Sequence, residues 1–384
     1  MKYILNIPNI SSLEKNYVND VLKENWLSIN GKHNQIAEKK FSKIVNKKYS
    51  LTLQNGTAAL HVVLKAMGVK NNDKVIIPNY SCSANINSVS QCNGIALVVE
   101  VEKETLGLDY DFVKKAILKY KPKVLQLVHI YGCPARDTLK ILKLCKKKKI
   151  FIIEDGSESL GAKIKEKKIG EFGDVSIFSL RSEKMLGVGE GAIVSTNNKD
   201  IYKKILLLSS RSMPYRSKKD KYWQKYVSNG EGYNYLMPHL LSAVLRGQVE
   251  RHKEIFKEKV RVGKLYRKTF KNYFNFSQKT PKNFLNVFWL NSICLEGLSI
   301  KDVRKVGEQL IKKGIEIRSG FWPLINTKGV KSIYVGNEKV SEDAFKKIIV
   351  LPSNYKLTEK DILYIRDQLI LIIKKIKPNF IFKK

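Results

Sequence analysis

Between residues 50 and 195 the sequence alternates short apolar runs, rich in Val and Ile, with longer stretches whose apolar residues recur at helical spacing, such as Asp111–Lys119 and Thr138–Lys148. The runs predict seven strands: Ser50–Leu53, Lys74–Ile77, Ile95–Val101, Val124–Ile130, Ile150–Ile153, Val175–Leu180 and Ala192–Ser195. Continuous apolar strands joined by helices are typical of a parallel sheet that is covered on both faces. The sequence therefore predicts an α/β fold with a mostly parallel sheet in an α/β/α arrangement.

The rest of the chain predicts a second, smaller unit. The polar and aromatic stretch Ser212–Tyr235 is typical of a long functional loop, and a long helix is expected from about Leu240 to Phe270. Further elements are expected at Val287–Leu295, Ile300–Lys313, Ile315–Arg318 and Thr358–Lys374. Because 384 residues exceed one ordinary core, we expect a large domain at 1–255 and a smaller C-terminal α+β domain at 256–384.

The net charge of +36, from 71 basic and 35 acidic residues, is unusual. Such a charge can attract nucleic acid, anionic lipid or a phosphorylated substrate. The lysines are spread along the whole chain, and the one tight run, Lys146–Lys149, closes a predicted helix where cations stabilise its C-terminus. We interpret the charge as solvated lysine-rich faces and expect no nucleic-acid partner.

The sequence also indicates the cellular setting. Its N-terminus lacks the apolar core and cleavage site of a signal peptide, and no apolar run is long enough to cross a bilayer. The five cysteines show neither a CxxC pair nor a Cys/His ligand spacing, which predicts free thiols and no metal site. A cytoplasmic protein without a membrane partner is expected.

Candidate functional residues follow the predicted strands, at the edge where α/β sheets bind ligands. After the first strand, Gly56 and Thr57 open a helix whose backbone N–H groups suit a phosphate, although an ordinary Thr N-cap explains the same residues. Asp155 ends the fifth strand, where its carboxylate can pair with a protonated ring nitrogen. A metal ligand, a general base and a helix cap are equal alternatives for Asp155 taken alone.

A lysine in a glycine-rich loop completes the pattern. Lys184 follows the sixth strand within Phe178–Gly191, where it can attack an aldehyde. In a chain this rich in lysine, any single lysine is usually a surface residue. The order of phosphate turn, carboxylate and lysine nevertheless indicates pyridoxal 5′-phosphate (PLP), whose charged ring acts as an electron sink.

The sequence resembles the DegT family of fold-type I, PLP-dependent sugar aminotransferases, and within it the GDP-perosamine synthase branch. The resemblance covers almost the whole chain in order and spacing. It is carried by Trp26–Phe41, Asn55–Leu60, Val128–Gly132, Ile152–Gly161, Gly170–Gly191, Gly232–Met237 and the neighbours of Arg318.

The resemblance implies a role for each residue at the cofactor. Lys184 would carry PLP as a Schiff base and later shuttle a proton between substrate and cofactor. Asp155 would hold the pyridine nitrogen, and Glu158 would contact the region of the ring hydroxyl. The cofactor phosphate would be bound by Gly56, Thr57 and Ser179.

The resemblance also implies partners. Asn234 would reach the phosphate of the partner subunit's cofactor, so the enzyme would be a homodimer with shared active sites. Glutamate would load the amine, and a keto sugar nucleotide would accept it. A minority branch of the family has histidine in place of the lysine and dehydrates deoxysugars, so Lys184 favours transamination here.

Several positions depart from the family pattern. Cys82 stands where the family has an aromatic residue on the cofactor ring, and Tyr80, two residues earlier, is a candidate substitute. The residues Leu180–Glu183 replace the usual aromatic-Gly-Asn, while Leu236 and His239 replace an arginine and an asparagine. The Cys82 change leaves the cofactor prediction intact, whereas the others bear on the acceptor pocket.

Two arginines are candidates for binding an anionic acceptor, because a guanidinium can bind two oxygens at once. Arg318 lies in the predicted small domain and Arg181 beside the cofactor lysine. Pairing of Arg318 with a carboxylate and simple solvation of Arg181 are the alternatives. The leading hypothesis is amination at C4 of a nucleotide-linked 4-keto-6-deoxy sugar for a surface glycan. A small phosphorylated ketone is the alternative acceptor.

Overall fold

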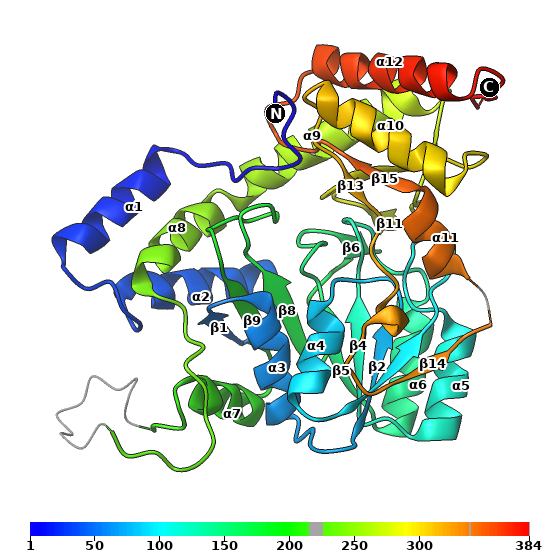
Figure 1. Cartoon of the computed structure of the whole chain (residues 1–384). Helices are drawn as coiled ribbons and strands as arrows, with labels where there is room; N and C mark the ends of the chain where they lie inside the picture. The colour runs from blue at the N-terminus through cyan, green and yellow to red at the C-terminus, as the bar shows by residue number, and fades with distance from the viewer. Residues whose placement is uncertain (215–225, 338, 384) are drawn as a thin grey trace.

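The computed structural model describes residues 1–214, 226–337 and 339–383. Its largest element is an eight-stranded sheet with the order β1-β9-β8-β5-β4-β2-β3-β14 (Figure 1). The strands are β1 (Tyr49–Leu53), β2 (Lys74–Pro78), β3 (Ile95–Val99), β4 (Val124–Val128), β5 (Phe151–Asp155), β8 (Val175–Ser179), β9 (Ala192–Thr196) and β14 (Ser332–Val335). Strand β9 runs antiparallel to its neighbours β1 and β8, and the other pairs are parallel. The predicted fold class is confirmed.

Helices cover both faces of this sheet. One face carries α3 (Gly56–Ala66), α4 (Ala84–Gln91) and α7 (Lys199–Ser209), and the other carries α2 (Lys32–Ile44), α5 (Tyr110–Tyr120) and α6 (Thr138–Lys148). In β2, Val75 and Ile77 pack on the α3 side while Ile76 packs on the α5 side. Because successive side chains point to opposite faces, a strand buried on both faces is apolar at every position.

A smaller antiparallel sheet, in the order β10-β12-β15-β13, builds the second unit (Figure 1). Its strands are β10 (Asn275–Phe276), β12 (Asn291–Cys294), β13 (Arg318–Ser319) and β15 (Ile348–Leu351). The helices around it are α9 (His252–Phe270), α10 (Ile300–Lys312), α11 (Val340–Lys347) and α12 (Glu359–Ile376). Buried Tyr266, Phe270, Ile293, Leu310 and Ile365 form its core.

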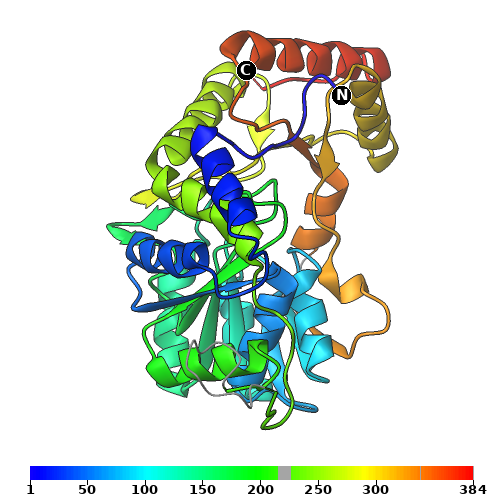
Figure 2. The ribbon, with the colours of Figure 1, turned by 90° about the vertical axis from the view of Figure 1, so that its left-hand side faces the viewer.

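The remaining elements are short or peripheral. A three-stranded sheet consists of β6 (Lys163–Ile164), β7 (Lys167–Lys168) and β11 (Phe284–Leu285), and η1 (Leu324–Asn326) is a 3₁₀ turn. The N-terminal helix α1 (Ser12–Lys23) packs against α8 (His239–Glu250), as both views of the ribbon show (Figures 1 and 2). None of the helices in the described residues is long and apolar enough to cross a bilayer.

The helix expected over 240–270 is two helices, α8 and α9, which meet at Arg251. The Arg251 guanidinium donates to Glu14 of α1 at 2.8 Å and to Glu254 at 2.9 Å. Residue 251 is neither proline nor glycine, so no local signal marks the break. The break lies at the residue whose side chain pairs with α1.

Two segments cross the expected boundary near residue 255. Strand β14 from the C-terminal part extends the large sheet beside β3, and Tyr3 from the N-terminus belongs to the core of the small unit. The division into 1–255 and 256–384 stays a prediction. In the loop expected over 212–235, residues 215–225 lie outside the described part of the chain.

Candidate functional site

A cavity of about 570 Å³ lies at the carboxyl edge of the large sheet. Segments that follow β1, β2, β5 and β8 supply most of its lining, as expected for an α/β sheet. The lining includes Gly56, Thr57, Cys82, Asn85, Asp155, Glu158, Ser179, Arg181, Glu183, Lys184, Tyr235, Trp289 and Phe321. The structure therefore brings together most of the residues that the sequence singled out.

Lys184 lies on a turn between β8 and β9. Backbone bonds from Val188 N to Leu180 O at 2.9 Å and from Ser182 N to Gly189 O at 2.9 Å close this turn. The Lys184 side chain is only 12% exposed, and its Nζ lies 3.2 Å from Oε1 of Glu158. The same Nζ lies 3.7 Å from the centroid of the Trp289 ring. A carboxylate and an aromatic face thus flank the amine.

Glu158 is the carboxylate that faces the lysine. Its second oxygen accepts a hydrogen bond from Tyr131 N at 2.9 Å, which fixes the side chain. Burial raises the pKa of Glu158, while the charge of Lys184 and the two hydrogen bonds oppose that rise. The pair can therefore hold or exchange a proton at Nζ.

Asp155, at the end of β5, is buried and is held by neutral donors. Its Oδ2 accepts from Asn85 Nδ2 at 3.0 Å and its Oδ1 from Ser157 N at 3.1 Å. Asn85 is oriented in turn by Gln126 Oε1 at 2.9 Å and by the hydroxyl of Ser81. No cation pairs with Asp155 within the described residues, so its charge remains available to a cationic group in the cavity.

The N-terminus of α3 lies at another wall of the cavity. Asn55 is the N-cap, and its side chain accepts from Ala58 N at 2.8 Å, so the Thr57 N-cap considered above is wrong. The amides of Gly56 and Thr57 belong to the first turn, which has no intrahelical acceptors. A Cβ on Gly56 would lie 3.6 Å from Cβ of Ser179, so these three residues lie together at a helix end suited to an anion.

Three predicted site residues lie outside the cavity around Lys184 or have side chains engaged in ion pairs. Asn234 lines an adjoining cavity of about 520 Å³ instead. Arg318 lines neither cavity, and its guanidinium pairs with Glu316 at 2.6 Å. Arg181 lines the cavity around Lys184, but it lies 3.4 Å from both Glu183 and Glu190.

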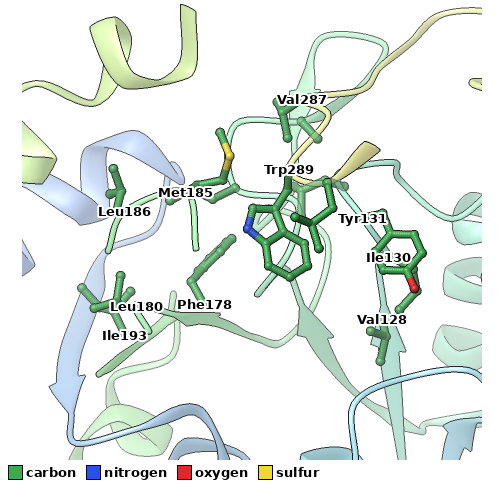
Figure 3. Packing of buried hydrophobic residues seen from close by; sticks show 14 of the residues in the cluster. Val128, Ile130, Tyr131, Phe178, Leu180, Met185, Leu186, Ile193, Val287 and Trp289 are labelled. Atoms are coloured by element: carbon green, nitrogen blue, oxygen red, sulfur yellow. The ribbon is translucent and has the colours of Figure 1, made fainter. Parts of the chain in front are cut away.

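The aromatic residues of the cavity are not those suggested by sequence. Tyr80 is buried with its hydroxyl 3.0 Å from that of Tyr131 and does not line the cavity, so its interpretation as a substitute for Cys82 is wrong. Exposed Cys82 does line it, and Trp289 and Phe321 from the C-terminal part add rings. Trp289 is held in an apolar cluster with Phe178, Met185 and Val287 (Figure 3).

These residues match the chemical groups of PLP. A partly buried amine suits its aldehyde, a buried carboxylate without a cationic partner suits its protonated ring nitrogen, and a helix N-terminus suits its phosphate. Lys184, Asp155 and the Gly56–Thr57 turn would hold these three groups. When bound, PLP supplies a ring that withdraws electrons from the reacting carbon.

Comparison with known proteins extends this result. The model of the DegT/DnrJ/EryC1/StrS aminotransferase family matches residues 8–370. GDP-perosamine synthase of Escherichia coli O157:H7 is 31% identical over 95% of this chain and 97% of its own. GDP-perosamine synthase of Vibrio cholerae is 33% identical over 75% and 76% of the two chains.

Solved structures share the fold at lower identity. A putative sugar aminotransferase of Streptococcus pneumoniae, in its PMP form, superposes with a TM-score of 0.88 at 21% identity, covering 97% of this chain and 99% of its own. The E. coli GDP-4-keto-6-deoxy-D-mannose-3-dehydratase with hydrated PLP gives a TM-score of 0.87 at 22% identity, covering 96% of this chain and 99% of its own. With a matching site, fold and family model, the chain belongs to the DegT/DnrJ/EryC1/StrS aminotransferases and is a PLP-dependent enzyme.

Proposed function

We propose that this enzyme transfers an amino group from glutamate to C4 of a nucleotide-linked 4-keto-6-deoxy sugar, in the manner of a GDP-perosamine synthase, for a surface glycan. The observation that carries the proposal is a single cavity that combines Lys184, Glu158 and Asp155 in a chain matching two GDP-perosamine synthases at 31% and 33% identity.

The cavity residues have separable tasks in this reaction. The Nζ of Lys184 is the group that takes and returns the proton at the reacting carbon, since it is the amine in the cavity nearest a carboxylate. Glu158 keeps this amine oriented and shares its proton. Asp155 would pair with the protonated ring nitrogen of PLP. Asn85 orients the Asp155 carboxylate through a hydrogen bond. The Gly56–Thr57 turn and Ser179 anchor the phosphate.

Departures from the family pattern and the ion pairs of Arg181 favour the alternative substrate. Leu236 and His239 stand where the family has an arginine and an asparagine, and Arg181 is offset by two carboxylates. A small phosphorylated ketone needs fewer contacts than a sugar nucleotide. The match to sugar enzymes over nearly the whole chain outweighs this point.

The test is a panel of acceptors with the glutamate-loaded enzyme. We expect the specificity constant for at least one of GDP-4-keto-6-deoxymannose and the UDP- and dTDP-linked 4-keto-6-deoxyglucoses to exceed that for small keto phosphates by tenfold or more. The physical reason is that remote parts of a substrate contribute binding energy at the transition state. Faster amination of a small keto phosphate than of all three sugars would overturn the sugar assignment and leave the aminotransferase intact.

The assembly belongs to the same proposal. Asn234 lies 50 residues after Lys184 and lines an adjoining cavity instead of the cofactor cavity. We infer that it contributes to the cofactor site of a partner subunit, which makes the working enzyme a homodimer with shared active sites.

A further inference from the structure

The cavity that Asn234 lines adjoins the cofactor cavity. The two share Gln54, Asn55 and Glu190 in their walls. The second cavity is lined in addition by Arg211, Leu236 and the helix start at Pro238. A ligand with one end at Lys184 can therefore extend into a second, polar compartment.

The three arginines considered as anion ligands differ in their ionic partners. Arg181 lies 3.4 Å from two carboxylates, Glu183 and Glu190, and Arg318 lies 2.6 Å from Glu316. Arg211 pairs with no carboxylate of the described chain and is exposed to the second cavity. Of these three arginines, Arg211 is therefore the one whose positive charge no carboxylate of the described chain offsets.

The backbone around Arg211 is held in an unusual conformation. Arg211 and the next residue, Ser212, both have positive φ, 63° and 52°, which side-chain-bearing residues rarely adopt. A Cβ on Gly232 would lie 2.2 Å from the backbone N of Ser212, so this approach requires glycine. Strained backbone that its surroundings enforce is found preferentially at ligand sites.

Backbone hydrogen bonds keep this conformation in place. Arg211 N donates to Tyr233 O at 2.9 Å, and Tyr235 N donates to Ser209 O at 3.0 Å. These bonds tie the arginine segment to the loop that carries Asn234 and Tyr235, and Tyr235 itself lines the cofactor cavity. The position of Arg211 relative to the site is thus determined by the fold.

We propose that Arg211 and the second cavity form an anion subsite for a phosphate of the acceptor's diphosphate, with Arg211 as the residue that binds two phosphate oxygens. The inference rests on the proposed function, because it requires an acceptor that carries its phosphates away from the reacting carbon. The family has an arginine at the position of Leu236, which lines the same cavity. Arg211 would supply the positive charge that is missing there.

The experiment measures binding of nucleoside diphosphates to the PLP-loaded enzyme by calorimetry, with GDP, UDP and dTDP as probes. The variants are R211Q, which removes the charge, and R211K, which keeps the charge but not the planar fork. Arg304 on α10 is exposed and pairs with Glu308, so R304Q is a control with the same change in net charge. A second measurement records, for the parent and each variant, whether glutamate bleaches the visible cofactor band.

We expect R211Q to weaken binding of the preferred nucleotide by tenfold or more and R211K by less, while R304Q binds like the parent. The cofactor band and the response to glutamate should match the parent in all variants. Unchanged nucleotide affinity in R211Q would refute the subsite and leave the proposed function standing. Loss of the cofactor band in R211Q would refute it too, because Arg211 would then hold cofactor. A parent enzyme that binds none of the three nucleotides would overturn both proposals.

Discussion

At the scale of single residues, the environment of Lys184 combines two groups that favour a positive charge. Oε1 of Glu158 lies 3.2 Å from Nζ, and the Trp289 ring face lies on another side of it. An aromatic face attracts a cation through its quadrupole. A carboxylate and an aromatic face therefore both lie beside the amine that the proposed reaction uses.

Replacing Lys184 by alanine should lower turnover by at least about a thousandfold, because both attachment of the cofactor and proton transfer need the amine. The far-ultraviolet circular dichroism should remain that of the parent, and the visible cofactor band should change. Lys147 on the exposed side of α6 provides the control K147A, which should behave like the parent. Parent-like turnover in K184A would refute the assignment.

The sequence predicted Lys184, Asp155 and Gly56 because each follows a strand of a parallel sheet, and strand ends meet at one edge. It could not predict Trp289 or Asn85. Trp289 comes from the C-terminal part of the chain and reaches the cavity only through tertiary packing. Asn85 is a polar residue on a short helix, and nothing in its local pattern distinguishes it from a surface asparagine.

At the scale of elements, the N-terminal segment connects the small sheet with the catalytic turn. Asn6 accepts from the fully buried Nζ of Lys259 and donates to the backbone oxygen of Glu183, the residue before Lys184. Trp289 Nε1 donates to the same oxygen at 2.6 Å, and Lys259 also donates to Ser353 O at 2.9 Å. Burial lowers the pKa of Lys259 to about 7.

This lowered pKa predicts a pH-dependent stability. Between pH 7 and the ordinary lysine pKa of 10.5, the unfolded chain binds a proton that the folded chain releases, so stability rises with pH. From pH 7.5 to 9 the parent should gain roughly 1–2 kcal/mol in free energy of unfolding relative to K259M. Urea unfolding at both pH values measures this. Lys257, exposed on the same helix, gives the control K257M, and equal slopes for both variants would contradict the prediction.

The predicted elements of the large sheet were confirmed with shifts of one or two residues, because both faces are buried and the apolar runs are continuous. Strand β14 was missed because its sequence, Ser332–Val335, is only partly buried at the edge of the sheet. The N-terminal helices α1 and α2 were also not predicted as such. Both are strongly polar, since each buries only one side against the large domain.

At the scale of the whole molecule, one chain does not hold all the proposed cofactor ligands in one cavity. Lys184, Asp155 and the Gly56–Thr57 turn share a cavity, whereas Asn234 lines the neighbouring one. If Asn234 serves a partner's cofactor, each active site draws residues from two subunits.

Light scattering at micromolar concentration should therefore show a homodimer.

K184A and N234A should each be strongly impaired alone, yet their co-expression should restore roughly a quarter of the parent's active sites. The reason is that half of the dimers are mixed and each mixed dimer has one intact site. Co-expression of K184A with parent-like K147A provides the comparison. An active monomer, or no recovery in the mixture, would refute the shared site.

The N-terminal segment also bears on how the enzyme is made on the ribosome. Lys2 and Tyr3 donate to Gly314 O, Ser353 N donates to Leu5 O, and Asn354 donates to Ile4 O, so residues 2–5 pair with residues made much later. Domains generally fold as they emerge, N-terminal parts first. Here the support for Glu183 must wait until residues beyond 350 have left the exit tunnel. The nascent chain can build seven strands of its large sheet before β14 is made, but its catalytic turn acquires this support only after residue 353 has emerged.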